Sequence, residues 1–264
     1  MLLGAAGFVW LSTAVQGADQ PVPFQLRAEG SFPLQYIETN TPKSRQNTES
    51  AAPYLGITAT ANLQSDISAS LFANGGHNQL GSFRDGDNTF LSSGANLVKH
   101  WGAFRAGVSF EHTHYFDDVF GTTSNIANDV NVFASYLWRP NPNLQIRPGV
   151  TATMRMDDSF VAQRYTYAAR IDIEQRLYGP WWFIASPRFR YYDYVGSEAG
   201  RRDRRFAAVA GLKYEINSSV DVKMLAGYDD RVSNVAGKGA DKFTVGASLD
   251  FNIDFERPRW PAGR

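Results

Sequence analysis

The stretch that decides the fold lies near the end of the chain, where residues 243–253 read FTVGASLDFNI. Every odd position from Phe243 to Ile253 is apolar, and every even position is polar or small. Side chains of a β-strand point alternately to its two faces, so this segment has one apolar and one polar face. It predicts a strand that separates two different solvents.

The same alternation recurs along most of the chain. It predicts about twelve strands of roughly 10 to 15 residues, near the length that a tilted membrane strand requires. The segments are 24–29, 55–63, 67–73, 88–98, 104–110, 130–138, 144–155, 164–174, 181–194, 205–216, 220–229 and 243–253.

The connections between these segments alternate in length. Short turns are predicted at 64–66, 99–102, 140–143, 178–180 and 217–219, and longer loops near 39–51, 74–88, 117–127, 157–161, 196–203 and 233–241. Such a series places all tight turns at one end of the sheet and all loops at the other. Outer-membrane barrels have this organisation, with periplasmic turns and both termini in the periplasm.

The composition excludes several classes of protein. The chain has 264 residues, with 26 Lys and Arg against 26 Asp and Glu, so it lacks the net positive charge expected of a nucleic-acid-binding protein. It contains no cysteine, which excludes disulfides and thiolate metal sites. Aromatic residues make up 14%, yet the mean hydropathy is −0.33. We expect no nucleic-acid partner and no cofactor.

Charge along the middle of the strands favours a closed barrel over a soluble sandwich. Arg170, Asp172, Glu174 and Arg176 follow one another on one face of a single strand. Closing the sheet pairs every strand edge, as lipid requires, and turns these charges towards an inner aqueous space. The predicted fold is therefore all-β: a transmembrane antiparallel up-and-down β-barrel of about 12 strands.

The ends of the chain are predicted to lie outside the barrel. Residues 1–18 are uncharged and apolar, which indicates a secretory signal peptide, although no Lys or Arg precedes the apolar part. A buried N-terminal helix is the alternative. We assign 19–255 to the barrel and 256–264 to a short periplasmic tail.

Residues Thr244 to Phe251 match the C-terminal β-signal of bacterial outer-membrane proteins: polar, any, Gly, any, any, hydrophobic, any, aromatic. Over about residues 20–255, the chain resembles porin-like outer-membrane β-barrels of Gram-negative bacteria. The resemblance implies a place in the outer membrane, insertion by the barrel assembly machinery, and contact with membrane lipid and lipopolysaccharide. It differs from the usual pattern in that the chain continues beyond the aromatic residue. The sequence indicates no particular oligomeric state.

The polar faces suggest what the lumen does. The strands over 144–216 carry most of the inward cations, whereas the strands over 52–98 carry hydroxyl and amide groups. We expect a small channel for anionic or sugar-like solutes, since guanidinium rows attract carboxylates and phosphates. The candidate solute-binding residues are Arg147, Arg155, Arg164, Arg170, Arg176, Arg188, Arg190, Arg205, Lys213 and Tyr192. Tyr194 and Trp182 are expected on the same side, where rings stack on sugars.

Three alternatives stand beside the channel. The charges could form a lattice that closes the lumen of a structural barrel. The outer loops could serve a receptor, adhesin or export function. A lipid-modifying enzyme could use His112 and His114, which share the lipid-facing parity of Phe104 to Phe110. No serine partner or catalytic motif accompanies these histidines, so we predict neither catalytic residues nor a metal site.

Overall fold

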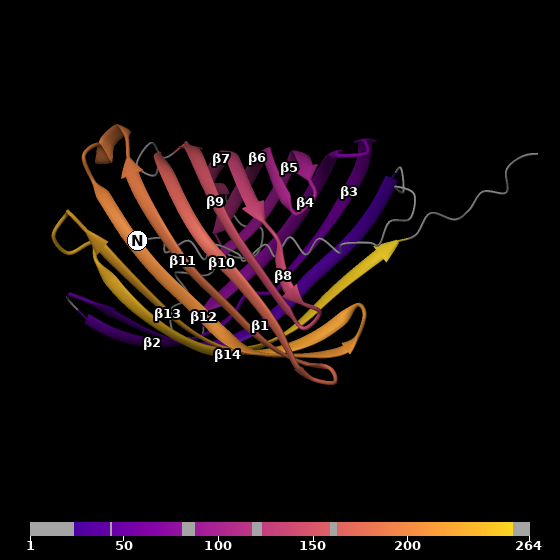
Figure 1. Cartoon of the computed structure of the whole chain (residues 1–264). Helices are drawn as coiled ribbons and strands as arrows, with labels where there is room; N and C mark the ends of the chain where they lie inside the picture. The colour runs from indigo at the N-terminus through magenta and orange to yellow at the C-terminus, as the bar shows by residue number, and fades with distance from the viewer. Residues whose placement is uncertain (1–23, 43, 81–87, 118–122, 159–162, 256–264) are drawn as a thin grey trace, which may run out of the picture.

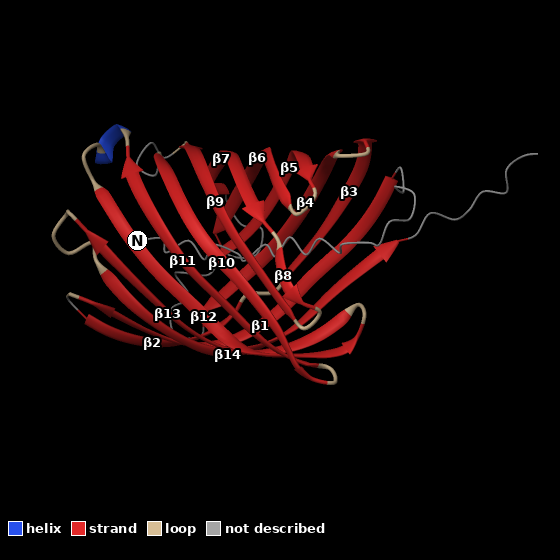
Figure 2. Cartoon of the chain, in the orientation of Figure 1, coloured by secondary structure: helices blue, strands red, loops and turns tan. Residues whose placement is uncertain are grey.

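A computed structural model describes residues 24–42, 44–80, 88–117, 123–158 and 163–255. The predicted signal peptide and the predicted C-terminal tail lie outside these residues. The described part is one antiparallel sheet of strands with one short 3₁₀ segment (Figures 1 and 2). No helix within it is long and apolar enough to cross a membrane.

The strands follow the order that the alternation predicts. They are β1 (Phe24–Thr41), β2 (Ser44–Ala51), β3 (Tyr54–Gln64), β4 (Ile67–Leu80), β5 (Asn88–Trp101), β6 (Phe104–Asp117), β7 (Thr123–Tyr136), β8 (Trp138–Asn141), β9 (Leu144–Asp157), β10 (Arg164–Tyr178), β11 (Trp181–Tyr194), β12 (Arg202–Asn217), β13 (Val220–Ser233) and β14 (Ala240–Phe255), with the 3₁₀ segment η2 (Gly196–Glu198) before β12.

The sheet closes on itself because β1 pairs with β14. Leu26 lies opposite Phe255, and the pairing continues to Asn40 opposite Asp241. Each remaining barrel strand pairs with its sequence neighbours, so twelve strands form the closed wall, with β2 and β8 as additional segments. The prediction of a closed antiparallel barrel of about twelve strands is confirmed.

Prolines explain the two additional segments. β2 pairs with the C-terminal half of β1, and β3 pairs with its N-terminal half. The interruption between the two pairings falls at Pro33 and Pro53. β7 and β8 likewise both pair with β9, and they separate opposite Pro148. Proline has no backbone N–H to donate to a ladder, so each break lies where a donor is missing.

The expected loop near 39–51 is strand instead. Residues 44–51 form β2 and pair with β1 as far as Thr41. β4 similarly extends to Leu80, into the segment expected to be a loop. Both faces of β2 are largely exposed and polar, so no hydrophobic alternation marks it in the sequence. Five tight turns join strands at one end of the barrel, at or next to the predicted positions, although residues 99–101 of the expected turn 99–102 belong to β5.

The two faces of the wall differ as predicted. Large apolar side chains are exposed on the outer face, including Leu71 at 67% and Leu34 at 66%. Most buried side chains lie on the inner face and are polar, among them Ser135, Ser186 and Lys223, whereas the buried Thr89 lies on the outer face beside His77. Aromatic residues lie near the strand ends of the outer face: Tyr136, Trp138, Tyr165, Tyr214, Tyr228 and Phe255. An apolar outside and a polar inside suit a barrel surrounded by lipid.

Candidate functional site

One row of inward residues brings three arginines together across five strands. Arg105 of β6 lies opposite Ser135, which lies opposite Gly149 of β9. Gly149 faces Arg170 of β10, and Arg170 faces Arg188 of β11. Ser135 and Gly149 are small, which leaves space between the guanidinium groups, and Arg105 Nε donates to Ser135 Oγ at 2.8 Å.

A second row lies two residues nearer the loops. Arg190 of β11 faces Arg205 of β12, which faces Arg231 of β13. Arg205 is paired with Asp229 through bonds of 2.7 Å from Nε. Arg190 Nη1 donates to the hydroxyl of Tyr192 at 3.3 Å. We call these two rows the arginine rows. The first consists of Arg105, Arg170 and Arg188, and the second of Arg190, Arg205 and Arg231.

Asp172 is the carboxylate nearest the first row. Its Oδ2 lies 3.3 Å from Arg170 Nε, and its Oδ1 accepts a bond of 2.8 Å from Ser186 Oγ. Arg147 faces Asp172 across the β9–β10 pair. The ladder between β10 and β11 lapses beside this point, opposite Pro187, without a change of register. The side-chain bond from Ser186 therefore joins the two strands where the backbone bonds are interrupted.

Carboxylates compensate part of the predicted cation set. Arg155 binds Asp129 with two hydrogen bonds of 2.5 and 2.9 Å. Lys213 lies 3.2 Å from Glu215 and 3.5 Å from Glu174. In the described part of the chain, Arg147 and Arg190 make no ion pair within 4.0 Å; Arg155, Arg170, Arg205 and Lys213 each make at least one.

Aromatic rings on this wall are covered by cations. Arg164 lies over Tyr192 and Tyr194 at 5.4 and 5.8 Å from the ring centroids. Lys213 and Arg176 lie over Trp182 at 4.9 and 5.6 Å. Tyr192 and Trp182 are only 8% and 9% exposed. These rings orient the cations by cation–π contact, an arrangement different from the open stacking platform that we expected.

Arg176 lies at the turn end of the lumen, away from the arginine rows. Its Nε donates to the carbonyl oxygen of Gly179 at 2.8 Å, within the tight turn between β10 and β11. The side chain is exposed there. Arg176 is therefore a predicted solute-binding residue that lies at the turn-end mouth of the lumen.

The opposite wall, formed by β3, β4 and β5, carries neutral groups. Asn96 Nδ2 donates to Ser70 Oγ at 3.1 Å. Phe72 also points inward, and its ring occupies the space where a side chain of Gly94 would lie. The neutral wall was predicted from the sequence, but its inward phenylalanines were not.

Sequence reasoning missed two members of the arginine rows, Arg105 and Arg231. Parity could have found both. Arg105 lies between the outward residues Phe104 and Ala106, and Arg231 follows the inward Asp229 by two. Arg231 lies beyond the end predicted for its strand, at residue 229, and Arg105 lies on the predicted strand 104–110, to which no inward charge was assigned.

The loop between β11 and β12 is fixed by a buried ion-pair cluster. Arg201 donates to Glu198 at 2.5 Å and to Asp203 at 2.6 and 3.1 Å, and Asp203 is fully buried. Lys238 of the next loop lies 3.5 Å from Glu198. At this height the outward residues Asp193 and Arg204 are charged, so the cluster lies beyond the apolar band. We call Glu198, Arg201 and Asp203 the loop clamp.

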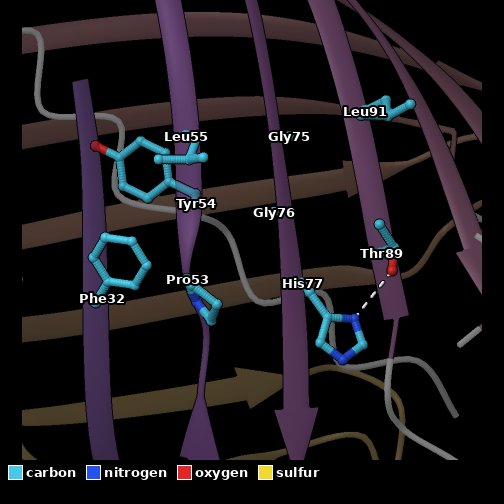
Figure 3. A pocket seen from close by; sticks show the side chains of 9 residues that line it. All are labelled: Phe32, Pro53, Tyr54, Leu55, Gly75, Gly76, His77, Thr89 and Leu91. Atoms are coloured by element: carbon cyan, nitrogen blue, oxygen red, sulfur yellow. Dashed lines mark hydrogen bonds between the residues drawn. The ribbon is translucent and has the colours of Figure 1, made fainter. Parts of the chain in front are cut away.

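A groove on another part of the wall lies apart from the arginine rows. It has a volume of about 370 Å³ and is lined by residues of β1, β3, β4 and β5 around Gly75 and Gly76. In Figure 3, Phe32, Leu55 and Leu91 lie around these glycines, and His77 Nδ1 is 3.0 Å from Thr89 Oγ1. Its position beside the break at Pro53 explains the groove as a gap in packing.

Several solved structures are similar to this chain at low sequence identity. An outer-membrane channel from Pseudomonas putida F1 is similar with a TM-score of 0.60 and 13% identity, covering 91% of this chain and 100% of that chain. The translocator domain of the autotransporter NalP from Neisseria meningitidis has a TM-score of 0.45 and 11% identity, covering 89% and 90%. An anion-selective porin from Comamonas acidovorans has a TM-score of 0.43 and 9% identity, covering 86% and 100%. No curated protein sequence matches the chain.

The model of one protein family, described as "Putative beta-barrel porin 2", matches residues 74–252. This match covers more than half of the chain and includes both arginine rows. It agrees with the closed barrel, the apolar outer face and the polar lumen. The chain thus belongs to the Putative beta-barrel porin 2 family of bacterial outer-membrane barrels.

Proposed function

We propose that the barrel is a channel for small anionic solutes, and that the arginine rows attract them. The observation that carries the proposal is the cross-strand order of these residues. Arg170 lies directly opposite Arg188, and Arg190 directly opposite Arg205, so like charges adjoin on one wall. Adjacent like charges destabilise a sheet, and such an arrangement is explained if it binds an anion.

The imbalance of charge on the cationic wall supports the same proposal. On β9, β10 and β11, seven inward cations stand against three inward carboxylates. The cations are Arg147, Arg155, Arg164, Arg170, Arg176, Arg188 and Arg190, and the carboxylates are Asp157, Asp172 and Glu174. A wall with this excess concentrates anions from solution near its surface.

The neutral wall suggests the body of the solute. Inward Ser, Thr and Asn side chains of β3, β4 and β5 offer hydrogen bonds, and Phe72 offers an apolar ring. A molecule with one anionic group and a hydroxylated body would find a partner on each wall. Acidic sugars have this chemistry, and we place them first among the solutes.

Conductance of the purified protein in a planar bilayer tests the proposal. We expect single-channel steps, and a reversal potential in a salt gradient that has the sign set by chloride. A preference for cations would refute the anionic solute. Absence of conductance would favour the alternative of a structural barrel, in which pairs such as Arg155 with Asp129 and Lys223 with Asp250 close the lumen.

The remaining expectations belong to this proposal as well. Membrane lipid and lipopolysaccharide would contact the outer face, and the barrel assembly machinery would recognise Thr244 to Phe251. An enzymatic role for His112 and His114 would show as phospholipase activity or an altered lipid A profile, and unchanged values in a His112→Ala variant would exclude it.

A further inference from the structure

Two histidines on the outer face of β6 form a pair that the channel does not use. His112 and His114 follow the outward residues Val108 and Phe110, which are 47% and 45% exposed. Asp117, three residues beyond His114, is the exposed end of the strand. The pair therefore lies near the loop end of the apolar face, where water and lipid headgroups meet.

The two imidazole rings point their Nε2 atoms at each other. The distance between His112 Nε2 and His114 Nε2 is 2.8 Å, and the planes of the two rings make an angle of 76°. On its other side, His112 Nδ1 lies 2.7 Å from Asn128 Oδ1 of β7. A carboxamide oxygen only accepts, so Nδ1 of His112 carries the proton and its Nε2 presents a lone pair.

We propose that His112 and His114 bind a Cu²⁺ ion through their Nε2 atoms. Two nitrogens 2.8 Å apart, each at the usual metal–imidazole distance of about 2.0–2.1 Å, enclose an angle of roughly 85–90° at the metal. That angle is the cis angle of a square-planar or tetragonal ion, which favours Cu²⁺ or Ni²⁺. Zn²⁺ prefers a tetrahedral site, so the rings would have to separate to hold it.

Asn128 has the position of a supporting residue for such a site. Histidines that bind metals usually donate their second N–H to an oxygen acceptor, which fixes the ring and its tautomer. Asn128 provides this acceptor to His112, and Phe116 stacks on the ring of His114 with centroids 6.3 Å apart. Both rings are thus held with their Nε2 atoms adjacent. In the metal-free protein His114 Nε2–H donates to His112 Nε2, and Cu²⁺ binding would take the place of this proton, which moves to Nδ1 of the neutral His114 ring.

The protein would supply two ligands only. The described residues contain no cluster of three or more His, Cys, Asp or Glu side chains with metal-binding geometry. Water or the phosphate oxygens of neighbouring lipid would complete the coordination. We therefore expect a site of moderate affinity, open to exchange from the outer surface.

Electron paramagnetic resonance of the refolded barrel with Cu²⁺, without a polyhistidine tag and in phosphate-free detergent, tests the site. We expect one bound Cu²⁺ with hyperfine structure from two nitrogens, and weaker binding of Zn²⁺ in competition. His112→Ala and His114→Ala should each abolish the two-nitrogen signal. Asn128→Leu should weaken Cu²⁺ binding by about tenfold.

His77→Ala is the matched control, because His77 is also an outward histidine near the loops and is hydrogen bonded to Thr89. Its Cu²⁺ spectrum should equal that of the unmodified protein. Heat-modifiable migration on gels confirms that each variant has folded. Identical spectra in the unmodified protein and in folded His112→Ala would overturn the proposal, as would Zn²⁺ binding as tightly as Cu²⁺.

Discussion

Replacement of Arg147 and Arg190 with glutamine should reduce the anion selectivity of the channel. Both side chains point into the lumen. Neither makes an ion pair within 4.0 Å among the described residues, so their replacement breaks no ion pair and leaves every paired carboxylate with its partner. The other cations of the wall remain. The change therefore removes two uncompensated charges of the cationic wall, one from the arginine rows (Arg190) and one from β9 outside them (Arg147).

The expected magnitude follows from the barrel geometry. Twelve strands spaced about 4.8 Å apart and tilted by about 40° close at a backbone radius of roughly 12 Å. An arginine extends roughly 6 Å from its Cα, so an ion on the axis lies roughly 6 Å from the guanidinium group. At that distance two unit charges interact by about 0.4 kcal/mol in screened water. Each arginine lowers the energy of an anion on the axis by this amount and raises that of a cation by the same amount. Removal of two arginines therefore changes the ratio of anion to cation permeability roughly tenfold.

Reversal potentials in a salt gradient measure this ratio. The double variant should shift the reversal potential towards that of a nonselective pore, while its single-channel steps persist. Arg204→Gln is the matched control, since Arg204 is exposed on the outer side of β12, one residue before the inward Arg205. Equal selectivity in the double variant and in the unmodified protein would refute the assignment of solute attraction to these arginines.

Three further predictions concern the clamp and the wall. Burial alone would raise the pKa of Asp203, but the hydrogen bonds from Arg201 and Ser233 hold the pKa below its usual range. A carboxyl group with a lowered pKa in the folded protein stabilises the clamp above about pH 4. This stability is lost as the pH falls through the pKa of the folded state. Limited proteolysis of the loop should therefore accelerate below about pH 4, and Asp203→Asn should produce the same acceleration at pH 7; equal rates would contradict the clamp. Gly211→Ala should prevent folding, since its Cβ would collide with the backbone oxygen of Met224, and unchanged heat-modifiable migration would exclude this clash. Phe251→Ala should reduce the yield of inserted barrel, measured in outer-membrane fractions, because Phe251 ends the β-signal and stacks on Phe32; normal insertion would show that this aromatic is dispensable.

Alternation in the sequence predicted most strands because each face of a barrel strand meets one solvent along its length. Phe243 to Ile253 and the strand from Phe206 to Ile216 both follow this rule. β2 escaped prediction because it lies beyond the apolar band, where both faces meet water and no pattern is required. The position of each break depended on prolines such as Pro53 and Pro148, whose effect appears only when the partner strand is known.

The candidate site was predictable residue by residue but not as an arrangement. Parity placed Arg170 and Arg188 in the lumen, yet only the register of β10 against β11 makes them direct neighbours. The sequence also does not show which carboxylate neutralises which arginine, since Asp129 lies 26 residues from Arg155 and on a different strand. A one-residue change of register would exchange the two faces, so sequence alone leaves pairing undetermined.

The division between compensated and uncompensated cations connects stability with selectivity in one wall. Arg155 with Asp129 and Lys223 with Asp250 tie neighbouring strands together, and replacing one member leaves a charge unpaired inside the barrel. Arg147 and Arg190 contribute no such tie, so their charge is available to a passing ion. Substitutions of the first kind should therefore lower the stability of the barrel with little change in selectivity, and substitutions of the second kind should do the reverse. If a single lattice served only to close the lumen, every inward arginine would behave like Arg155.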